Sequence, residues 1–231
     1  MENILTNNLA GPAGRIRNSN LAQAWLVLVL ALIFGAILAA IQVKLSPIIA
    51  ANKMNETLEK IPELVWGDAA ARHMAAKTAD TQITPGTIEI QKNGAASFYN
   101  LFRVMSQGEP AGWVVKTEGQ GYADRIELLM GFNPEVTAIT GLFILEQKET
   151  PGLGAKIILP NWRQQFIGKK TDQPLTIVKN GASTSHGIDA ITGATISSRS
   201  VVGMVNRTMD DLAGKLTAAS VRFFKKAVRH E

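Results

Sequence analysis

Cysteine is absent from this 231-residue chain. That absence excludes disulfides, cysteine-ligated iron–sulfur clusters and thiol catalysis. Histidine occurs three times, at His73, His186 and His230, and no pair has the H-x-x-x-H or H-E-x-x-H spacing typical of zinc sites. We therefore expect no metal site built from this chain.

Signatures of nucleotide binding and of hydrolytic catalysis are also missing. The sequence has no P-loop, no G-x-G-x-x-G fingerprint and no Ser-His-Asp arrangement. We therefore expect no NAD site and no catalytic residue. The net charge of +5 comes with no nucleic-acid-reading motif, so nucleic acid is not an expected partner. Part of the charge lies in the basic, Phe-containing tail 222–229, which fits contact with anionic lipid or with a partner protein.

A long apolar run is present near the N-terminus. Residues 24–41 (AWLVLVLALIFGAILAAI) contain no polar side chain, and about 20 such residues span a bilayer. The run is longer than the 7–15 residues of a signal-peptide core, although Ala39 and Ala40 leave cleavage open. We predict a retained transmembrane helix at 24–43. It carries no charge within the membrane, so it is not an expected ion path.

The orientation of this helix does not follow from its flanking charges. Arg15 and Arg17 precede the segment, and Lys44 and Lys53 follow it. The positive-inside comparison is therefore a tie.

The remaining pattern predicts an α+β fold. A helix is expected at 46–62, and the Ala-rich segment 67–87 is expected to be loosely packed, with a turn at Pro85–Gly86. Residues rich in β-branched, aromatic and Leu side chains predict strands at 98–105, 112–117, 126–132, 137–147 and 175–178, with a short helix at 161–167. We expect a twisted, mostly antiparallel sheet with helices packed on it.

A further helix follows residue 196. Ser197 or Ser198 is suited to cap its N-terminus. Apolar side chains recur at helical spacing along one face of it, at Val201, Val202, Val205, Met209, Leu212 and Leu216.

Two segments have unusual local chemistry. Residues 149–154 (ETPGLG) follow a strong strand and bring two glycines and a proline together, so they form either a ligand-binding loop or a plain turn. Residues 192–198 (TGATISS) place four hydroxyl groups and two small residues at a helix start. Free N–H groups there favour a phosphate, and a hydroxyl-rich helix cap is the alternative.

The second segment resembles a known modification motif. Residues 189–195 match the pattern Asp-x-x-(Ser/Thr)-Gly-Ala-(Thr/Ser), which a flavin transferase recognises in FMN-binding domains. The resemblance implies that FMN is joined covalently, as a phosphodiester, to the Thr195 oxygen. The segment 149–154 resembles the second signature of the same family. By that resemblance the flavin ring is expected near Glu149, Thr150 and Leu153, with Gly154 also in the cofactor-binding loop, and the ribityl phosphate near Thr192, Gly193, Ala194, Ser197 and Ser198.

The whole chain resembles the G subunit of the Rnf ion-translocating electron-transport complex. Residues 1–23 are then expected to be cytoplasmic, 44–96 to be a membrane-proximal helical linker, and 97–231 to be an FMN-binding domain on the periplasmic or exterior side. The expected partners are the other membrane subunits, a flavin transferase and membrane lipid. The implied activity is that of an oxidoreductase subunit in an ion-translocating complex that couples ferredoxin and NAD, without complete activity alone.

Two other interpretations remain. The C subunit of the sodium-pumping NADH:quinone reductase shares the anchor, the domain and the FMN-threonine. Alternatively, the protein is a membrane-anchored binding module without a redox role, in which 192–198 only caps a helix.

Overall fold

The computed structural model describes most of the chain, in two compact units. Backbone is described for residues 20–75, 81–92, 94–179, 185–217, 219–224 and 228–229, and side chains for these ranges except 20–21, 68–75 and 228–229. The units are Met1–Asn55 and Glu56–Glu231. His73 and His230 fall outside the described side chains.

The first unit is the helical anchor. Helix α2 (Asn20–Ala75) runs from this unit into the second, with a non-helical backbone at Gly67 (φ 78°). Every side chain from 24 to 43 is exposed, including Trp25 at 68% and Leu38 at 67%. Within the described residues this is the one helix that is long and apolar enough to cross a membrane. A core helix of a water-soluble domain would bury these side chains, so their exposure fits a membrane anchor. The helix predicted at 46–62 is confirmed within α2.

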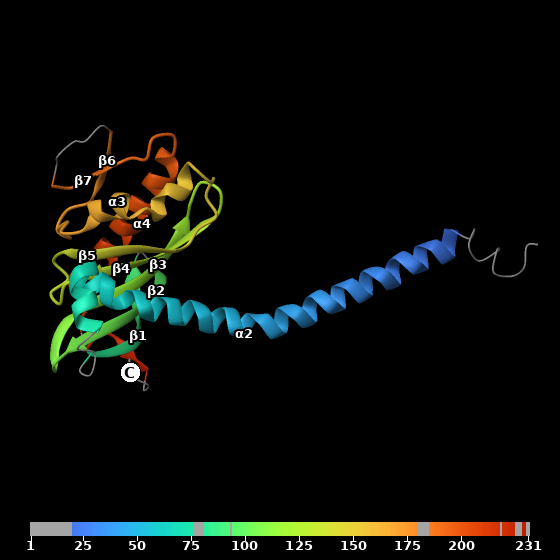
Figure 1. Cartoon of the computed structure of the whole chain (residues 1–231), viewed down its shortest axis with the longest axis horizontal. Helices are drawn as coiled ribbons and strands as arrows, with labels where there is room; N and C mark the ends of the chain where they lie inside the picture. The colour runs from blue at the N-terminus through green and yellow to red at the C-terminus, as the bar shows by residue number, and fades with distance from the viewer. Residues whose placement is uncertain are drawn as a thin grey trace, which may run out of the picture. The chain divides into compact units, whose positions relative to one another are not determined.

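The second unit is built on an antiparallel sheet, which confirms the α+β prediction (Figure 1). Five long strands form a meander: β1 (Thr81–Lys92), β2 (Ala95–Ser106), β3 (Glu109–Gln120), β4 (Arg125–Phe132) and β5 (Ile139–Glu146). Their order is β5-β4-β3-β2-β1, and the short strands β8 (Arg222–Phe223) and β9 (Val228–Arg229) both pair with β1. The four long strands predicted from residue 98 onward are confirmed.

Strand β1 differs from the sequence prediction. Residues 81–87 were assigned above to a loosely packed segment with a turn at Pro85–Gly86, but they belong to β1. The strand continues through this dipeptide because it lies near the sheet edge, where Phe224 N–H donates to the Pro85 carbonyl. A Cβ at Gly86 would lie 2.6 Å from Val221 Cγ1, so glycine allows the C-terminal segment to approach. The boundary expected at residue 97 consequently falls inside β2.

One face of the sheet is covered by the end of α2. Leu58, Ile61, Leu64 and Val65 are buried against an apolar cluster on the strands, formed by Ile83, Phe102, Val104, Val114 and Leu129. The Leu64 carbonyl accepts a hydrogen bond from Thr140 Oγ1 at 2.6 Å. Each buried aliphatic side chain contributes about 1.5–3 kcal/mol. Residues that follow the anchor in sequence are therefore part of the core of this unit.

The opposite face carries the helices that form the site. Helix α4 (Thr195–Leu212), 3-10 helix η2 (Gly154–Ile158), α3 (Pro160–Arg163) and 3-10 helix η3 (Gln164–Phe166) pack there (Figure 1). The predicted apolar face of α4 is confirmed, although α4 ends at Leu212, before the buried Leu216. The helix predicted at 161–167 is divided between α3 and η3. The strand predicted at 175–178 is β6 (Thr176–Val178), which pairs in parallel with β7 (Gly187–Asp189).

Candidate functional site

The N-terminus of α4 is the centre of the site. Gly193 has φ +79°, a conformation suited to glycine, and reverses the chain just before the helix. The residue at the N-cap position is Ala194, and no side chain caps the helix. The first N–H groups of this 18-residue helix therefore lack a capping oxygen, which is the arrangement that favours an anion.

The two serines predicted as caps have other roles. The Ser198 hydroxyl donates to the Ala194 carbonyl and accepts from the Ile191 N–H, both at 3.0 Å. The Ser197 hydroxyl donates to Glu149 Oε2 at 2.5 Å. The capping prediction was wrong because α4 begins at Thr195, so both serines lie inside its first turn with buried side chains.

Thr195 is the first residue of α4, and its side chain is partly exposed. Among the residues that the structure describes, none hydrogen-bonds to the Thr195 hydroxyl. Thr192 and Gly193 are exposed beside it. Thr195 is therefore a partly exposed threonine at a helix start, with exposed Thr192, Gly193 and Ile196 near it.

Glu149 joins the two motifs. Its side chain is 4% exposed, and Oε1 accepts from the backbone N–H groups of Tyr122 and Ala123 at 2.9 and 3.0 Å. Its other oxygen accepts the Ser197 hydroxyl. One buried carboxylate thus fixes three segments that are distant in sequence: the loop after β3, the loop after β5 and the first turn of α4. Hydrogen bonds to a buried charged acceptor contribute about 1.5–3 kcal/mol each.

The loop 149–154 is a tight turn that approaches α4 closely. The Thr150 carbonyl accepts from the N–H groups of Leu153 and Ala155, both at 3.1 Å, and Gly152 has φ +74°. A Cβ at Gly154 would lie 2.5 Å from Ser197 Oγ and 2.7 Å from Glu149 Oε2. Only glycine fits between the two groups, so the signature is more than a plain turn. The structure places the two predicted segments side by side.

The first residue of the motif, Asp189, is held by a segment of α3 and η3. Trp162 Nε1 donates to the Asp189 carbonyl at 2.9 Å, and the Asp189 N–H donates to Gln165 Oε1 at 2.7 Å. Trp162 packs edge-to-face on Phe166, with 5.2 Å between ring centroids. Gln165, Tyr122 and the loop around it were not identified from the sequence. Their roles depend on backbone contacts, for which the sequence carries no signal.

Apolar side chains and a small pocket surround the helix start. Leu153, which lies close to Gly193, and Ile196, in the first turn of α4, are 44% and 52% exposed, respectively. A pocket of about 290 Å³ lies beside Thr192 and Ile191, with Trp162, Gln165 and the ammonium-bearing Lys156 in its lining. The surroundings of Thr195 therefore offer apolar surface together with donors for an anion.

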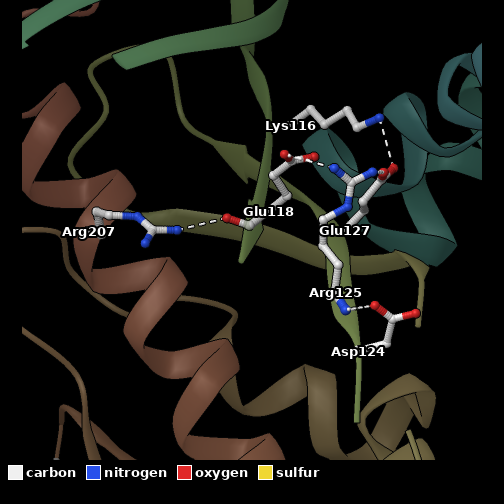
Figure 2. A network of polar contacts seen from close by, with 6 residues as sticks. All are labelled: Lys116, Glu118, Asp124, Arg125, Glu127 and Arg207. Carbon is white, nitrogen blue, oxygen red and sulfur yellow. Dashed lines mark hydrogen bonds and ion pairs between the residues drawn. The ribbon is translucent and has the colours of Figure 1, made fainter. Parts of the chain in front are cut away.

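A network of charges stiffens the sheet next to the Tyr122 loop (Figure 2). Arg125 pairs with Glu118 at 3.1 Å and with buried Glu127 at 2.6 Å, and Lys116 pairs with Glu127 at 2.9 Å. The Asp124 carboxylate accepts from the Arg125 N–H, and this bond, together with Lys148, lowers the pKa of Asp124 below its usual value. These contacts thus lie on the two strands, β3 and β4, that flank the loop that binds Glu149.

The described residues contain no group of three His, Cys, Asp or Glu side chains that could hold a metal ion. His186, the one histidine whose side chain is described, contacts Ser185 at 2.8 Å and Asp172 at 3.5 Å.

Comparison with known proteins confirms the type of domain. Residues 121–210 match the model of the FMN-binding domain family. This match contains the Tyr122 loop, both motifs and most of α4, which are the segments that Glu149 joins.

The chain is similar to subunits of two kinds of complex, ion-translocating oxidoreductases and Na⁺-translocating NADH-quinone reductases. The chain is 34% identical to the G subunit of the Na⁺-translocating ferredoxin:NAD⁺ oxidoreductase complex of Acetobacterium woodii, over 61% of this chain and 70% of that protein. It is 33% identical to the G subunit of the ion-translocating oxidoreductase complex of Methanosarcina acetivorans, over 61% and 72%. Identity to the C subunit of the Na⁺-translocating NADH-quinone reductase of Vibrio anguillarum is 32%, over 53% of this chain and 51% of that protein.

Among solved structures, NqrC of Shewanella oneidensis has the same fold. Its TM-score is 0.55 at 20% identity, with 69% of this chain and 93% of that chain covered.

Proposed function

The chain belongs to the family of G subunits of ion-translocating oxidoreductase complexes, and we propose that it is the electron-transfer flavoprotein of such a complex, with FMN joined covalently to Thr195. The observation that carries this proposal is the meeting of the two motifs at the start of α4, where Glu149 binds Ser197 at 2.5 Å beside the accessible Thr195. The complex would couple electron transfer between ferredoxin and NAD to ion movement.

The helix start suits the phosphate of a phosphodiester. Its N–H groups lack a side-chain cap, and the helix dipole adds partial positive charge at the same point. Gly193 leaves the approach open, since a Cβ there would reach only Leu153 Cδ2, at 3.1 Å. Lys156 in the adjacent pocket adds a cation. These features favour a bound phosphate over a hydroxyl-rich cap, because no hydroxyl caps the helix.

The apolar rim suits a flavin ring. Leu153 lies against Gly193, and Ile196 exposes apolar surface in the first turn of α4. We propose that Thr150 and Leu153 contact the ring, whereas the buried Glu149 acts by positioning the loops.

Bound FMN supplies transfer of one or two electrons, and the protein provides attachment, orientation and surroundings. The Glu149 carboxylate ties two loops to the first turn of α4, so the attachment point keeps one geometry. Covalent attachment keeps the flavin from diffusing away from an open aqueous face. The redox partners, NAD and ferredoxin, would bind on other subunits.

We further propose that residues 24–43 anchor the subunit in the cytoplasmic membrane, with the FMN domain on the periplasmic or exterior side. The exposed apolar surface of this part of α2 supports the anchor. The side is proposed from family membership. A cysteine introduced at the exposed position Glu109 of the cysteine-free chain would test it. Labelling of intact spheroplasts by a membrane-impermeant maleimide supports the exterior side, and labelling only after lysis refutes it.

The covalent bond can be tested on a denaturing gel. Expressed with a flavin transferase, the protein should give an ultraviolet-fluorescent band, and the peptide containing Thr195 should gain the mass of one FMN minus water. Thr195→Ala should abolish both signals. Thr195→Ser should keep them because it keeps the hydroxyl, and Thr192→Ala should only reduce them. A dark wild-type band from transferase-expressing cells would refute the proposal.

The homologous role in an NADH:quinone reductase is the competing assignment. Identity to the G subunit of Acetobacterium woodii is 34% over 70% of that protein. For C subunits it is 32% over 51% of the Vibrio anguillarum protein and 26% over 68% of the Vibrio parahaemolyticus protein, so identity and coverage taken together favour the G subunit. Purification of the native complex would decide between them. Ferredoxin:NAD activity in the purified complex supports the proposal, and NADH:quinone activity without it supports the competitor.

A further inference from the structure

A pocket of about 470 Å³ lies at the end of α4 opposite to Thr195. It is lined by Arg103 of β2, by residues within 110–113 of β3, by the β4–β5 loop at 134–136, and by residues within 212–217. Helix α4 has 18 residues, so about 25 Å along the helix separates the pocket from Thr195. Pockets that bind small molecules measure about 300–1,000 Å³. The pocket is therefore large enough for a ligand and is distinct from the site described above.

Arg103 brings a positive charge without a counterion to this pocket. Its Nε is buried without a hydrogen-bond partner, and its guanidinium makes no hydrogen bond or ion pair with any residue that the structure describes. The group lies over the stacked rings of Trp113 and Phe223, 5.9 and 6.0 Å from their centroids. These cation–π contacts hold the guanidinium but satisfy none of its N–H donors. A carboxylate in the pocket would supply the missing acceptors, because its two oxygens match the guanidinium fork.

Glu135 brings the opposite charge to the same lining. Its exposed carboxylate accepts a hydrogen bond from Asn133 Nδ2 at 2.9 Å, and within the described part of the chain it makes no ion pair, with Arg103 or with another residue. The C-terminal end of α4, at Leu212, also lines the pocket and adds partial negative charge. These two groups would repel a simple anion and attract an ammonium group. The pocket therefore offers one unpaired cation and one unpaired anion that do not neutralise each other.

The walls of the pocket are held in place by the fold. Trp113 Nε1 donates to the Pro134 carbonyl at 3.2 Å, and Thr171 Oγ1 donates to the Val136 carbonyl at 2.7 Å. Val136 has φ +58°, a conformation that β-branched residues rarely adopt, and these contacts maintain it. Pro110, Trp113 and Val136 give the lining an apolar character. The two charges are thus presented on a preformed, partly apolar surface.

We propose that this pocket binds a small zwitterion with an apolar body, of the class of α-amino acids with an apolar side chain. Arg103 binds the carboxylate, Glu135 and the end of α4 bind the ammonium, and the side chain packs against Trp113 and Val136. A ligand with both charges satisfies both groups at once. A simple acid or a simple amine would satisfy one group and be repelled by the other. The inference does not depend on the flavin, since the pocket and Thr195 lie at opposite ends of α4.

Ligands that each lack one group test the proposal on the unmodified protein. Full-length protein in an uncharged detergent is titrated calorimetrically with L-phenylalanine, with phenylpropanoate, which lacks the ammonium, and with phenylethylamine, which lacks the carboxylate. We expect L-phenylalanine to bind with a Kd of about 1 mM or below, and each deletion to weaken binding by about tenfold or more. No binding of L-phenylalanine, or equal binding of phenylpropanoate, would overturn the proposal. Tighter binding of glycerophosphoethanolamine, a zwitterionic lipid headgroup, would overturn the assignment to amino acids.

Two variants locate the ligand in the pocket. Arg103→Gln should weaken binding of L-phenylalanine by about tenfold or more, and Arg103→Lys, which keeps the charge but not the planar fork, should bind with intermediate affinity. Glu135→Gln should weaken binding of L-phenylalanine but not of phenylpropanoate, because the latter has no ammonium for Glu135 to bind.

Arg199→Gln is the matched control, because Arg199 is an exposed arginine near the other end of α4, and its loss should leave binding unchanged. Near-ultraviolet circular dichroism checks that each variant is folded, and the ligand series above needs no variant. Unchanged binding by folded Arg103→Gln, an equal loss in Arg199→Gln, or an equal effect of Glu135→Gln on both ligands would contradict the proposed pocket.

Discussion

Gly154 should be one of the least replaceable residues in the site. A Cβ at this position would lie 2.5 Å from Ser197 Oγ, 2.7 Å from Glu149 Oε2 and 3.0 Å from Glu149 Cβ. These distances are well below van der Waals contact. Neither neighbour has freedom to move, because Ser197 is fixed in the first turn of α4 and Glu149 is held by two backbone N–H groups. Gly154→Ala must therefore break the bond between Ser197 and Glu149.

The expected loss follows from two effects. Overpacking a fixed site by one methyl group costs about 1–3 kcal/mol. Loss of a buried hydrogen bond to a charged acceptor costs about 1.5–3 kcal/mol. The two effects overlap, so we expect the free energy of unfolding to fall by about 3 kcal/mol. For a domain of this size that corresponds to a decrease in Tm of about 6–12 °C. Flavin attachment should also slow, because the motif loses its contact with the 149–154 loop.

Gly203→Ala is the matched control. Gly203 is exposed within α4, and nothing lies within 4 Å of a Cβ placed there. The same substitution should therefore stabilise the protein by about 0.5–1 kcal/mol, because alanine is the better helix former.

Thermal unfolding of the full-length protein in detergent, followed by near-ultraviolet circular dichroism, measures both variants. In-gel flavin fluorescence over a time course of transferase co-expression measures attachment. If Gly154→Ala unfolds at the wild-type temperature and acquires flavin at the wild-type rate, the role assigned to the contact between Ser197 and Glu149 is wrong. A decrease of equal size in Gly203→Ala would show that the effect is not specific to the site.

Two further predictions concern the ends of α4. Trp162→Phe removes the donor to the Asp189 carbonyl, so the free energy of unfolding in denaturant should fall by about 1 kcal/mol. Flavin attachment, followed by mass spectrometry, should also be slower. Unchanged attachment would refute the positioning role of Trp162. Burial raises the pKa of Asp211, but hydrogen bonds from Tyr99 and Lys92 outweigh it and hold that pKa below 3.8. The native state therefore binds this proton less readily than the unfolded state, and the stabilisation is lost as pH falls through and below 3.8. Asp211→Asn should be less stable at pH 7 by about 1–2 kcal/mol, and the difference should shrink in acid; a difference independent of pH would contradict this.

The sequence was sufficient wherever the signal is local. The apolar run 24–41 predicts its own exposed helix, because length and hydrophobicity require no partner within the chain. The long strands after residue 97 follow from runs of β-branched, aromatic and Leu residues, and the buried face of α4 follows from helical spacing. Both motifs are short and contiguous, so the order of their residues is enough to recognise them.

Tertiary structure decided whatever depends on a distant partner. The dipeptide Pro85–Gly86 is typical of a turn in sequence, but in the structure the C-terminal segment packs on it and it belongs to β1. The sequence predicts that Ser197 caps the helix, but its hydroxyl donates instead to Glu149, 48 residues earlier in the chain. The absence of cysteine excludes disulfides, cysteine-ligated clusters and thiol catalysis from this chain. The fold determines which of the remaining side chains lie together.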